Sequence, residues 1–180
     1  MNKHRSIGWL GALLLAGVAT SSMNAADAPD SEQASKLLSE AKTLAFQLKE
    51  DAFTMESFTR SNLGWESHTV AITQIKEHVN ALARQVAKLK TARSTASPWQ
   101  KTCIDRINPF LDELEGYTEA VIEHLNKQPR LLTTAEYKDY LEANADYAGD
   151  LAAMIGDFVD YGRTKQRLQR LTDKLELPAR

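Results

Sequence analysis

Apolar residues recur every three or four positions along most of the chain, which is the spacing of one face of an α-helix. The most regular run steps by three and four over residues 65–89 and takes in Trp65, His68, Ile72, Ile75, Val79, Leu82, Val86 and Leu89. No stretch alternates with a period of two, and no Asn-Gly or Asp-Gly pair signals a β-hairpin. The pattern therefore predicts an all-α protein with seams of the bundle or coiled-coil type.

Prolines and capping residues divide this pattern into four predicted helices, at about residues 30–59, 64–93, 98–127 and 134–175. Connections this short favour an antiparallel up-down-up-down four-helix bundle. Pro109 falls inside the third helix and is expected to kink it. Capping-box spacing marks three helix starts: Asp30 with Gln33, Ser97 with Gln100, and Thr133 with Glu136.

The fourth predicted helix is the longest, at roughly 60 Å for a rise of about 1.5 Å per residue. It outruns the other three, so its end is predicted to project or to bend near Gly162. Its apolar line repeats every seven residues: Tyr140, Tyr147, Met154, Tyr161, Leu168 and Leu175. The third helix has a comparable line of Trp99, Cys103, Ile107, Phe110, Leu114, Tyr117, Val121 and His124.

The first 25 residues have the architecture of a secretory signal peptide. Lys3 and Arg5 precede an uncharged apolar run, and small or polar residues follow it up to Ala25 and Ala26. We expect cleavage near Ala25 and a bacterial periplasmic or secreted location for the single domain of residues 26–180; an uncleaved N-terminal anchor is the alternative. No later segment has the 18 continuous apolar residues of a membrane span.

Composition narrows the class further. The 180 residues are 43% apolar and include one Cys, which excludes collagen-like, disulfide-framework and wholly disordered chains. Removal of Lys3 and Arg5 with the signal peptide changes the net charge from −2 to −4. This bulk charge argues against nucleic acid as a partner.

Three segments, Ser97-Pro98-Trp99-Gln100, Glu123-His124-Leu125-Asn126 and residues 160–165, resemble those of small exported bacterial helical proteins to which no activity is assigned. The resemblance implies an exported helical protein and transfers no chemistry. The marks of better-understood bundles are absent from the sequence. It has neither the Cys-x-x-Cys-His of covalent haem nor a Glu-x-x-His pair for a di-iron site.

Two histidines are predicted to meet at one end of the bundle. With a turn near Thr95 and Ala96, facing positions of antiparallel helices have numbers that sum to about 191 or 192. His68 and His124 meet this condition, and the other turns bring Met55, Glu136, Tyr137 and Tyr140 to the same level. Two interpretations remain open. The layer is a haem b or transition-metal site formed by Met55, His68 and His124, or it is a hydrogen-bonded polar layer without a cofactor.

The other candidate groups give no catalytic arrangement. His78 lies beside its seam and is expected to form a surface ion pair with Asp112 or Glu113. Cys103 lies in a seam and is expected to be buried; a bridge between two chains or a reactive thiol is the alternative. It lies about 30 Å from His124 along the same helix, by rise per residue, which excludes a Cys–His pair. We expect a protein that binds without catalysis.

Charge is distributed unevenly along the sequence. Residues 84–106 hold six basic residues and one acidic residue, residues 163–180 hold six and two, and residues 112–160 hold three and 12. In an up-down bundle both basic segments lie at one end, which favours contact with an anionic envelope component or a partner protein. A solvated surface with basic residues near helix C-termini is the alternative. The candidate contact residues are Lys88, Lys90, Arg93, Lys101, Arg163, Lys165, Arg167 and Arg170.

The signal-peptide prediction is tested by the mass of the exported protein. We expect an intact mass about 25 residues smaller than that of the full chain, with a new N-terminus near Asp27. Recovery of the full-length chain from the exported fraction would contradict cleavage.

Overall fold

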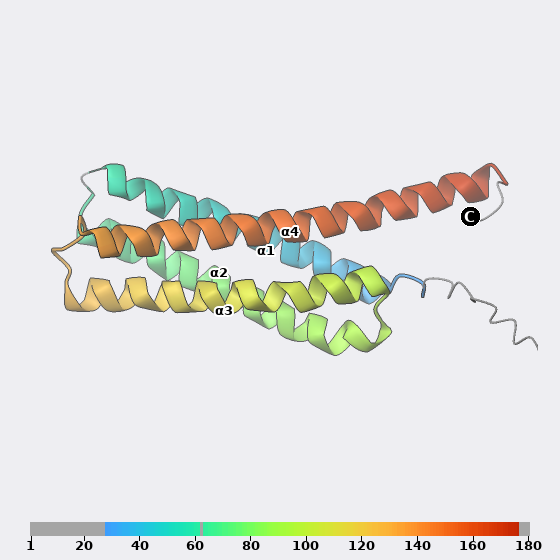
Figure 1. The fold of residues 1–180 in the computed structure, drawn as a ribbon, viewed down its shortest axis with the longest axis horizontal. Coiled ribbons are helices and arrows are strands. Elements are labelled where there is room, and N and C mark those ends of the chain that lie inside the picture. Colours follow the sequence, from blue (N-terminus) through green and yellow to red (C-terminus); the bar gives the residue numbers. More distant parts are fainter. Residues whose placement is uncertain (1–27, 62, 177–180) are drawn as a thin grey trace, which may run out of the picture.

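The computed structural model describes residues 28–61 and 63–176, and over these residues it is a four-helix bundle (Figure 1). The helices are α1 (Glu32–Ser57), α2 (Trp65–Ala92), α3 (Pro98–Lys127) and α4 (Ala135–Lys174). A single 3₁₀ turn follows each of the first two helices, η1 (Phe58–Arg60) and η2 (Arg93–Thr95). Each helix packs on two others, in the pairs α1–α2, α2–α3, α3–α4 and α1–α4. The predicted fold class is confirmed, and the predicted signal peptide lies outside the described residues.

The core is formed by one stripe from each helix. The stripe of α1 is rich in alanine, which allows α2 and α4 to approach closely: Ala34, Leu38, Ala41, Ala45, Leu48, Ala52 and Met55. The stripe of α2 follows the predicted seam from His68 to Leu89. Trp65, the first residue of that seam, is instead 39% exposed, and its indole N–H donates to the Leu125 carbonyl over 3.1 Å.

The buried face of α4 is not the predicted one. Its buried residues are mostly small: Tyr137, Leu141, Asn144, Ala145, Ala148, Leu151, Ala152, Ile155, Gly156, Val159 and Gly162. The predicted seven-residue line from Tyr140 to Leu175 lies at the edge of this face and is nowhere buried. A similar difference affects α3, where Leu111 and Thr118 are buried while Phe110 and Tyr117 are only half-buried.

Capping confirms one predicted helix start and corrects two. The Gln100 side chain accepts from the Ser97 backbone N–H over 2.9 Å, which is the reciprocal half of the predicted capping box. The N-cap of α1 is Ser31 and that of α4 is Thr134, each one residue after the predicted cap. Asp30 is drawn away from capping because its carboxylate accepts the indole N–H of Trp99 over 2.7 Å.

The buried Gln100 side chain also ties the start of α3 to the start of α1. Its amide oxygen accepts from the Ser31 backbone N–H over 3.0 Å, and its amide nitrogen donates to the Ser31 carbonyl and the Ser35 hydroxyl, both over 2.9 Å. These bonds satisfy a buried amide completely, so they fix the two helix starts relative to each other.

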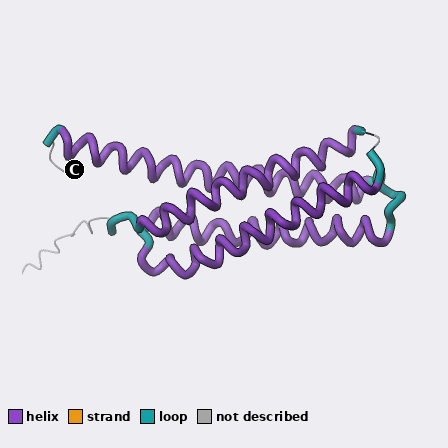
Figure 2. Tube along the Cα trace, turned by 180° about the vertical axis from the view of Figure 1, so that it is seen from behind, coloured by secondary structure: helices purple, strands orange, loops and turns teal. Residues whose placement is uncertain are grey.

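α4 continues past the end of the bundle, as the sequence predicts. No residue from 163 to 176 is buried, and Figures 1 and 2 show this part of α4 reaching beyond the turn that joins α2 to α3. We call residues 163–176 the α4 extension. Among the described helices, none is long and apolar enough to cross a membrane.

The extension begins at a close approach between Gly162 and the Trp99 ring. A Cβ atom at position 162 would lie 2.6 Å from Cη2 and 2.7 Å from Cζ2 of Trp99. The ring is held in place by its hydrogen bond to Asp30 and by an edge contact with Tyr161, whose ring centroid is 5.7 Å away. Only glycine leaves room for this packing.

We therefore expect Gly162→Ala to destabilise the protein by about 1–3 kcal/mol through overpacking, measured by denaturant unfolding. The matched control is Gly116→Ala on α3, where no atom outside the adjoining residues and backbone of the same helix lies within 4 Å of the added Cβ. That change should stabilise the helix by about 0.5–1 kcal/mol, because alanine replaces glycine within a helix. Equal stabilisation by both substitutions would show that the contact with Trp99 is unimportant.

Candidate functional site

Tyr137 joins the two predicted histidines at one end of the bundle. Its hydroxyl shares a hydrogen bond of 2.7 Å with Nδ1 of His68, and its ring stacks on that of His124 with a centroid distance of 4.6 Å. His124 Nε2 donates to the Leu131 carbonyl over 3.0 Å. The edge of Phe58 contacts the His68 ring at a centroid distance of 5.2 Å. We call His68, His124 and Tyr137 the histidine layer.

Helix order explains why these residues meet. His68 lies in the first turn of α2, His124 in the last turn of α3 and Tyr137 in the first turn of α4, so short turns bring all three to one end. Met55, the fourth residue named in the prediction, is buried near the end of α1, about one helical turn before Phe58 of η1. The other predicted members, Glu136 and Tyr140, are hydrogen-bonded to each other over 2.8 Å at the exposed edge.

Burial favours the uncharged forms of His68 and Tyr137. Desolvation lowers the pKa of His68 below 6.5 and raises the pKa of Tyr137 above its usual value of 10. One nitrogen of each imidazole is already bonded, so a metal ion on His68 Nδ1 would have to displace the Tyr137 hydroxyl. Within residues 28–61 and 63–176, no three His, Cys, Asp or Glu side chains form a group that could hold a metal ion. The geometry is that of a satisfied polar layer, and the haem or metal alternative stays a prediction.

Cys103 is buried, as predicted. Burial raises the pKa of its thiol to about 12, so the thiol stays protonated at neutral pH and is a poor nucleophile.

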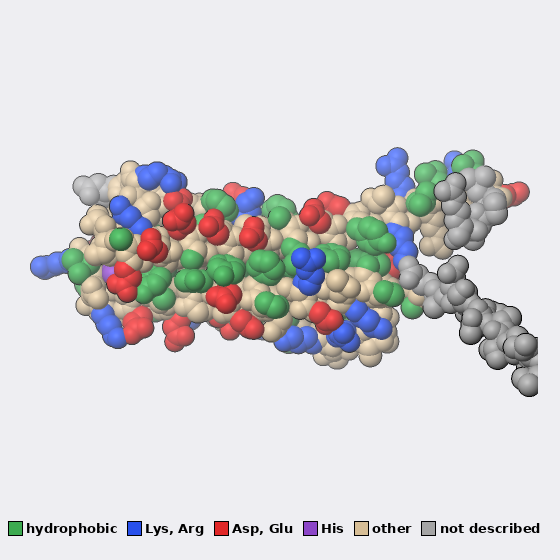
Figure 3. Space-filling view, viewed as in Figure 1, with side chains coloured by type: hydrophobic (Ala, Val, Ile, Leu, Met, Phe, Trp, Pro, Cys, Tyr) green, Lys and Arg blue, Asp and Glu red, His purple; other side chains and the backbone are tan. Residues whose placement is uncertain are grey.

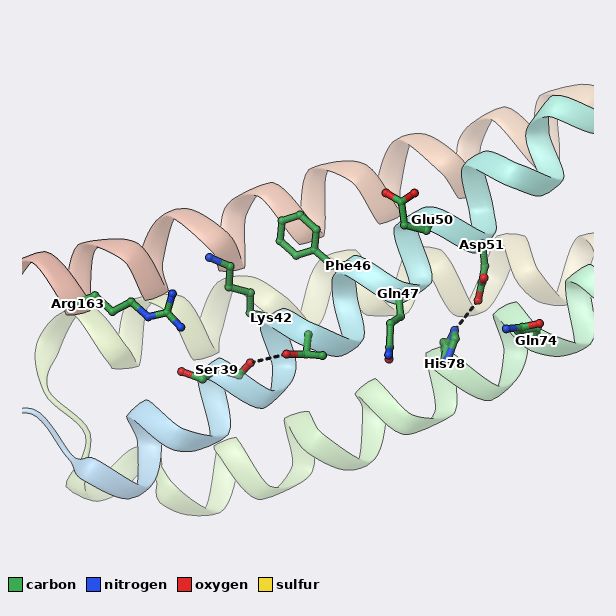
Figure 4. A pocket seen from close by; sticks show the side chains of 10 residues that line it. Ser39, Lys42, Phe46, Gln47, Glu50, Asp51, Gln74, His78 and Arg163 are labelled. Carbon is green, nitrogen blue, oxygen red and sulfur yellow. Dashed lines mark hydrogen bonds and ion pairs between the residues drawn. The ribbon is translucent and has the colours of Figure 1, made fainter.

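The predicted partners of His78 are wrong. Its Nδ1 lies 2.6 Å from the Asp51 carboxylate on α1, rather than near Asp112 or Glu113 on α3. His78 sits on the side of α2 that faces α1, so the choice of partner depends on rotation about the helix axis. Figure 4 shows this pair at one end of a shallow groove along α1, with Lys42 and Arg163 toward the other end.

The predicted basic end is partly neutralised by local pairs. Arg93 forms a bidentate pair with Asp105, with both distances 2.7 Å, whereas Lys90 donates to the uncharged amide of Asn108 over 2.6 Å. Near the start of the α4 extension, Lys165 lies 3.4 Å from Asp30 and Arg163 lies 3.5 Å from Asp160. Arg167 and Arg170 form no ion pair with the rest of the described chain. The positive charge of these two side chains therefore lies on the part of α4 that projects beyond the bundle.

An aromatic groove between α3 and α4 was not predicted from the sequence. The apolar residues that line it are Trp99, Phe110, Met154, Phe158 and Tyr161, and its charged residues are Arg106, Asp150 and Asp157. The Arg106 guanidinium lies over the Phe158 ring, 5.9 Å from its centroid. We call this the α3–α4 groove. The sequence signal that could have revealed this groove is the seven-residue line on α4, because Met154 and Tyr161 belong to that line and also line the groove.

Comparisons with protein-family models, with curated proteins and with solved structures find no match to this chain. The resemblance to small exported bacterial helical proteins and the exported location therefore remain predictions.

The histidine layer makes a testable contribution to stability. Tyr137→Phe removes the partner of a buried imidazole nitrogen, and we expect it to lower the free energy of unfolding by about 1–3 kcal/mol. Tyr140→Phe is the matched control, because its hydroxyl bonds to Glu136 at the exposed edge; we expect a change within about 0.5 kcal/mol.

Adding His68→Leu to Tyr137→Phe removes both partners of the buried bond. The double variant should then recover part of the loss, because no buried polar group is left unpaired. If Tyr137→Phe costs no more than Tyr140→Phe in denaturant unfolding, the buried bond does not stabilise the fold.

Proposed function

We propose that this protein is an exported interaction protein of the bacterial cell envelope, and that the α4 extension is its docking element for an anionic partner. The observation that supports this proposal most directly is the extension itself. It holds five basic and two acidic residues, a net charge of +3, on a helical segment in which no residue is buried.

The position of the extension suits such a role. A helix that projects from a folded bundle presents its charge away from the acidic surface of residues 112–160. A localised positive field steers association with a negatively charged surface and raises the association rate. The histidine layer offers less support for a ligand-binding function, because one nitrogen of each imidazole is already hydrogen-bonded, His68 to the Tyr137 hydroxyl and His124 to the Leu131 carbonyl.

Binding to isolated envelope material and to vesicles with an anionic lipid tests the proposal. The mature protein should bind at low salt and detach as the salt rises, since charges are screened over about 8 Å at physiological ionic strength. Replacement of Arg163, Lys165, Arg167 and Arg170 by Gln should remove most of the salt-dependent binding.

A matched control removes the same charge from the bundle instead. In this variant Lys76, Arg84, Arg130 and Lys138 are replaced by Gln, and binding should remain close to that of the wild type. Equal binding by the wild type and the extension variant at low salt, on both materials, would overturn the proposal.

A further inference from the structure

The α4 extension carries an apolar stripe as well as positive charge. Leu168 is 64% exposed, Leu171 46% and Leu175 61%. Their spacing from Tyr161, which lies just before the extension and is 52% exposed, is 7, 3 and 4 residues and places all four on one face. Most helices in proteins are stabilised by packing of such a face, whereas the part of this face beyond Tyr161 is nowhere buried among the described residues. A contiguous exposed apolar surface of this kind marks an interaction site.

The stripe continues directly into the α3–α4 groove. Met154 and Tyr161 in the groove occupy the same seven-residue line as Leu168 and Leu175 in the extension. Figure 3 shows hydrophobic side chains in a row along the middle of the α3–α4 face, with acidic side chains on both sides of the row. The groove and the extension are thus two parts of one apolar surface.

The two parts carry opposite charge at their borders. In the extension, Arg167, Arg170 and Lys174 follow each other at steps of three and four along one side of the stripe. In the groove, Asp150 and Asp157 lie on the α4 border, and neither forms an ion pair within the part of the chain that the structure describes. A basic, apolar helix matches an apolar groove with an acidic border.

The extension of one molecule cannot bind in the groove of that same molecule. The extension belongs to the same continuous helix as the groove's α4 side and points away from the groove (Figure 1). Nor do two extensions alone suit each other, because each carries a net charge of +3. The occupant that fits the groove is the extension of another copy.

We propose that two copies of this chain associate through a two-fold axis near Tyr161, each placing its α4 extension in the α3–α4 groove of the other. This inference rests on the proposed docking role of the extension and names a second copy as its partner. Antiparallel α4 helices that cross at Tyr161 bring Leu168 of one copy opposite Met154 of the other, seven residues from the axis, and Leu175 opposite Tyr147 at fourteen. The same surface is used on both copies, as a two-fold interface requires.

Sedimentation of the mature chain over a range of concentrations tests the proposal. We expect a dimer that weakens as salt rises. A variant with Arg167, Arg170 and Lys174 replaced by Glu should associate with itself at least about tenfold more weakly, and so should a variant with Asp150 and Asp157 replaced by Arg.

The decisive measurement is sedimentation of an equimolar mixture of these two variants. The acidic extension of the first then meets the basic groove of the second, and the basic extension of the second meets the acidic groove of the first. The mixture should regain the dimer that neither variant forms alone. A control with Lys76 and Arg84 replaced by Glu, on α2, should dimerise like the wild type, and circular dichroism should show the same helix content in all variants.

A wild-type protein that stays monomeric at every concentration would overturn the second-copy inference, and so would a mixture that fails to associate. If the extension variant nevertheless loses binding to envelope material, the proposed docking function stands and only the identity of the partner is wrong. If that binding is also unaffected, both proposals fail.

Discussion

The four helices cannot all end together, because α4 has 40 residues while its neighbours α1 and α3 have 26 and 30. The first turn of α4 is fixed by the histidine layer, so the surplus length must leave at the opposite end. Trp99 and Gly162 mark the point at which it leaves. The exposed leucines, the free positive charge and the open end of the α3–α4 groove all follow from this difference in length.

Periodicity and register were enough to predict much of this arrangement. Turns of a few residues fix which positions of antiparallel helices lie side by side, so the meeting of His68 and His124 around Tyr137 followed from residue numbers. Rotation of a helix about its own axis is set by packing with all its neighbours and is not fixed by turn length. That is why the ion-pair partner of His78 was expected on α3, whereas it lies on α1.

The buried face of α4 was misjudged for a different reason. A search for large apolar residues selects Tyr147, Met154 and Tyr161, whereas the buried stripe contains alanine and glycine. These small residues allow α1 and α4 to approach closely: a Cβ at Gly149 would lie 3.3 Å from the Phe53 ring, and one at Gly156 3.7 Å from the Phe46 ring. The volume of this contact is supplied by α1, so the α4 side shows little hydrophobic signal. The larger residues are left at the edge, where Met154 and Tyr161 line the groove.

Acidic and basic residues are separated along α4 into two long blocks. From residue 135 to 160 the helix holds seven acidic residues and one basic residue, and from 163 to 176 it holds two and five. The centres of the two blocks are about 33 Å apart at a rise of about 1.5 Å per residue, well beyond the screening length of about 8 Å at physiological ionic strength. Apart from the pair of Asp160 and Arg163 at their border, the two blocks therefore hardly attract each other. The acidic block even lies near the N-terminal half and the basic block near the C-terminus, as the helix dipole favours, but that effect fades within the first and last turns. Segregation over so many turns therefore has its main electrostatic effect between molecules, where a basic extension can lie directly against an acidic helix.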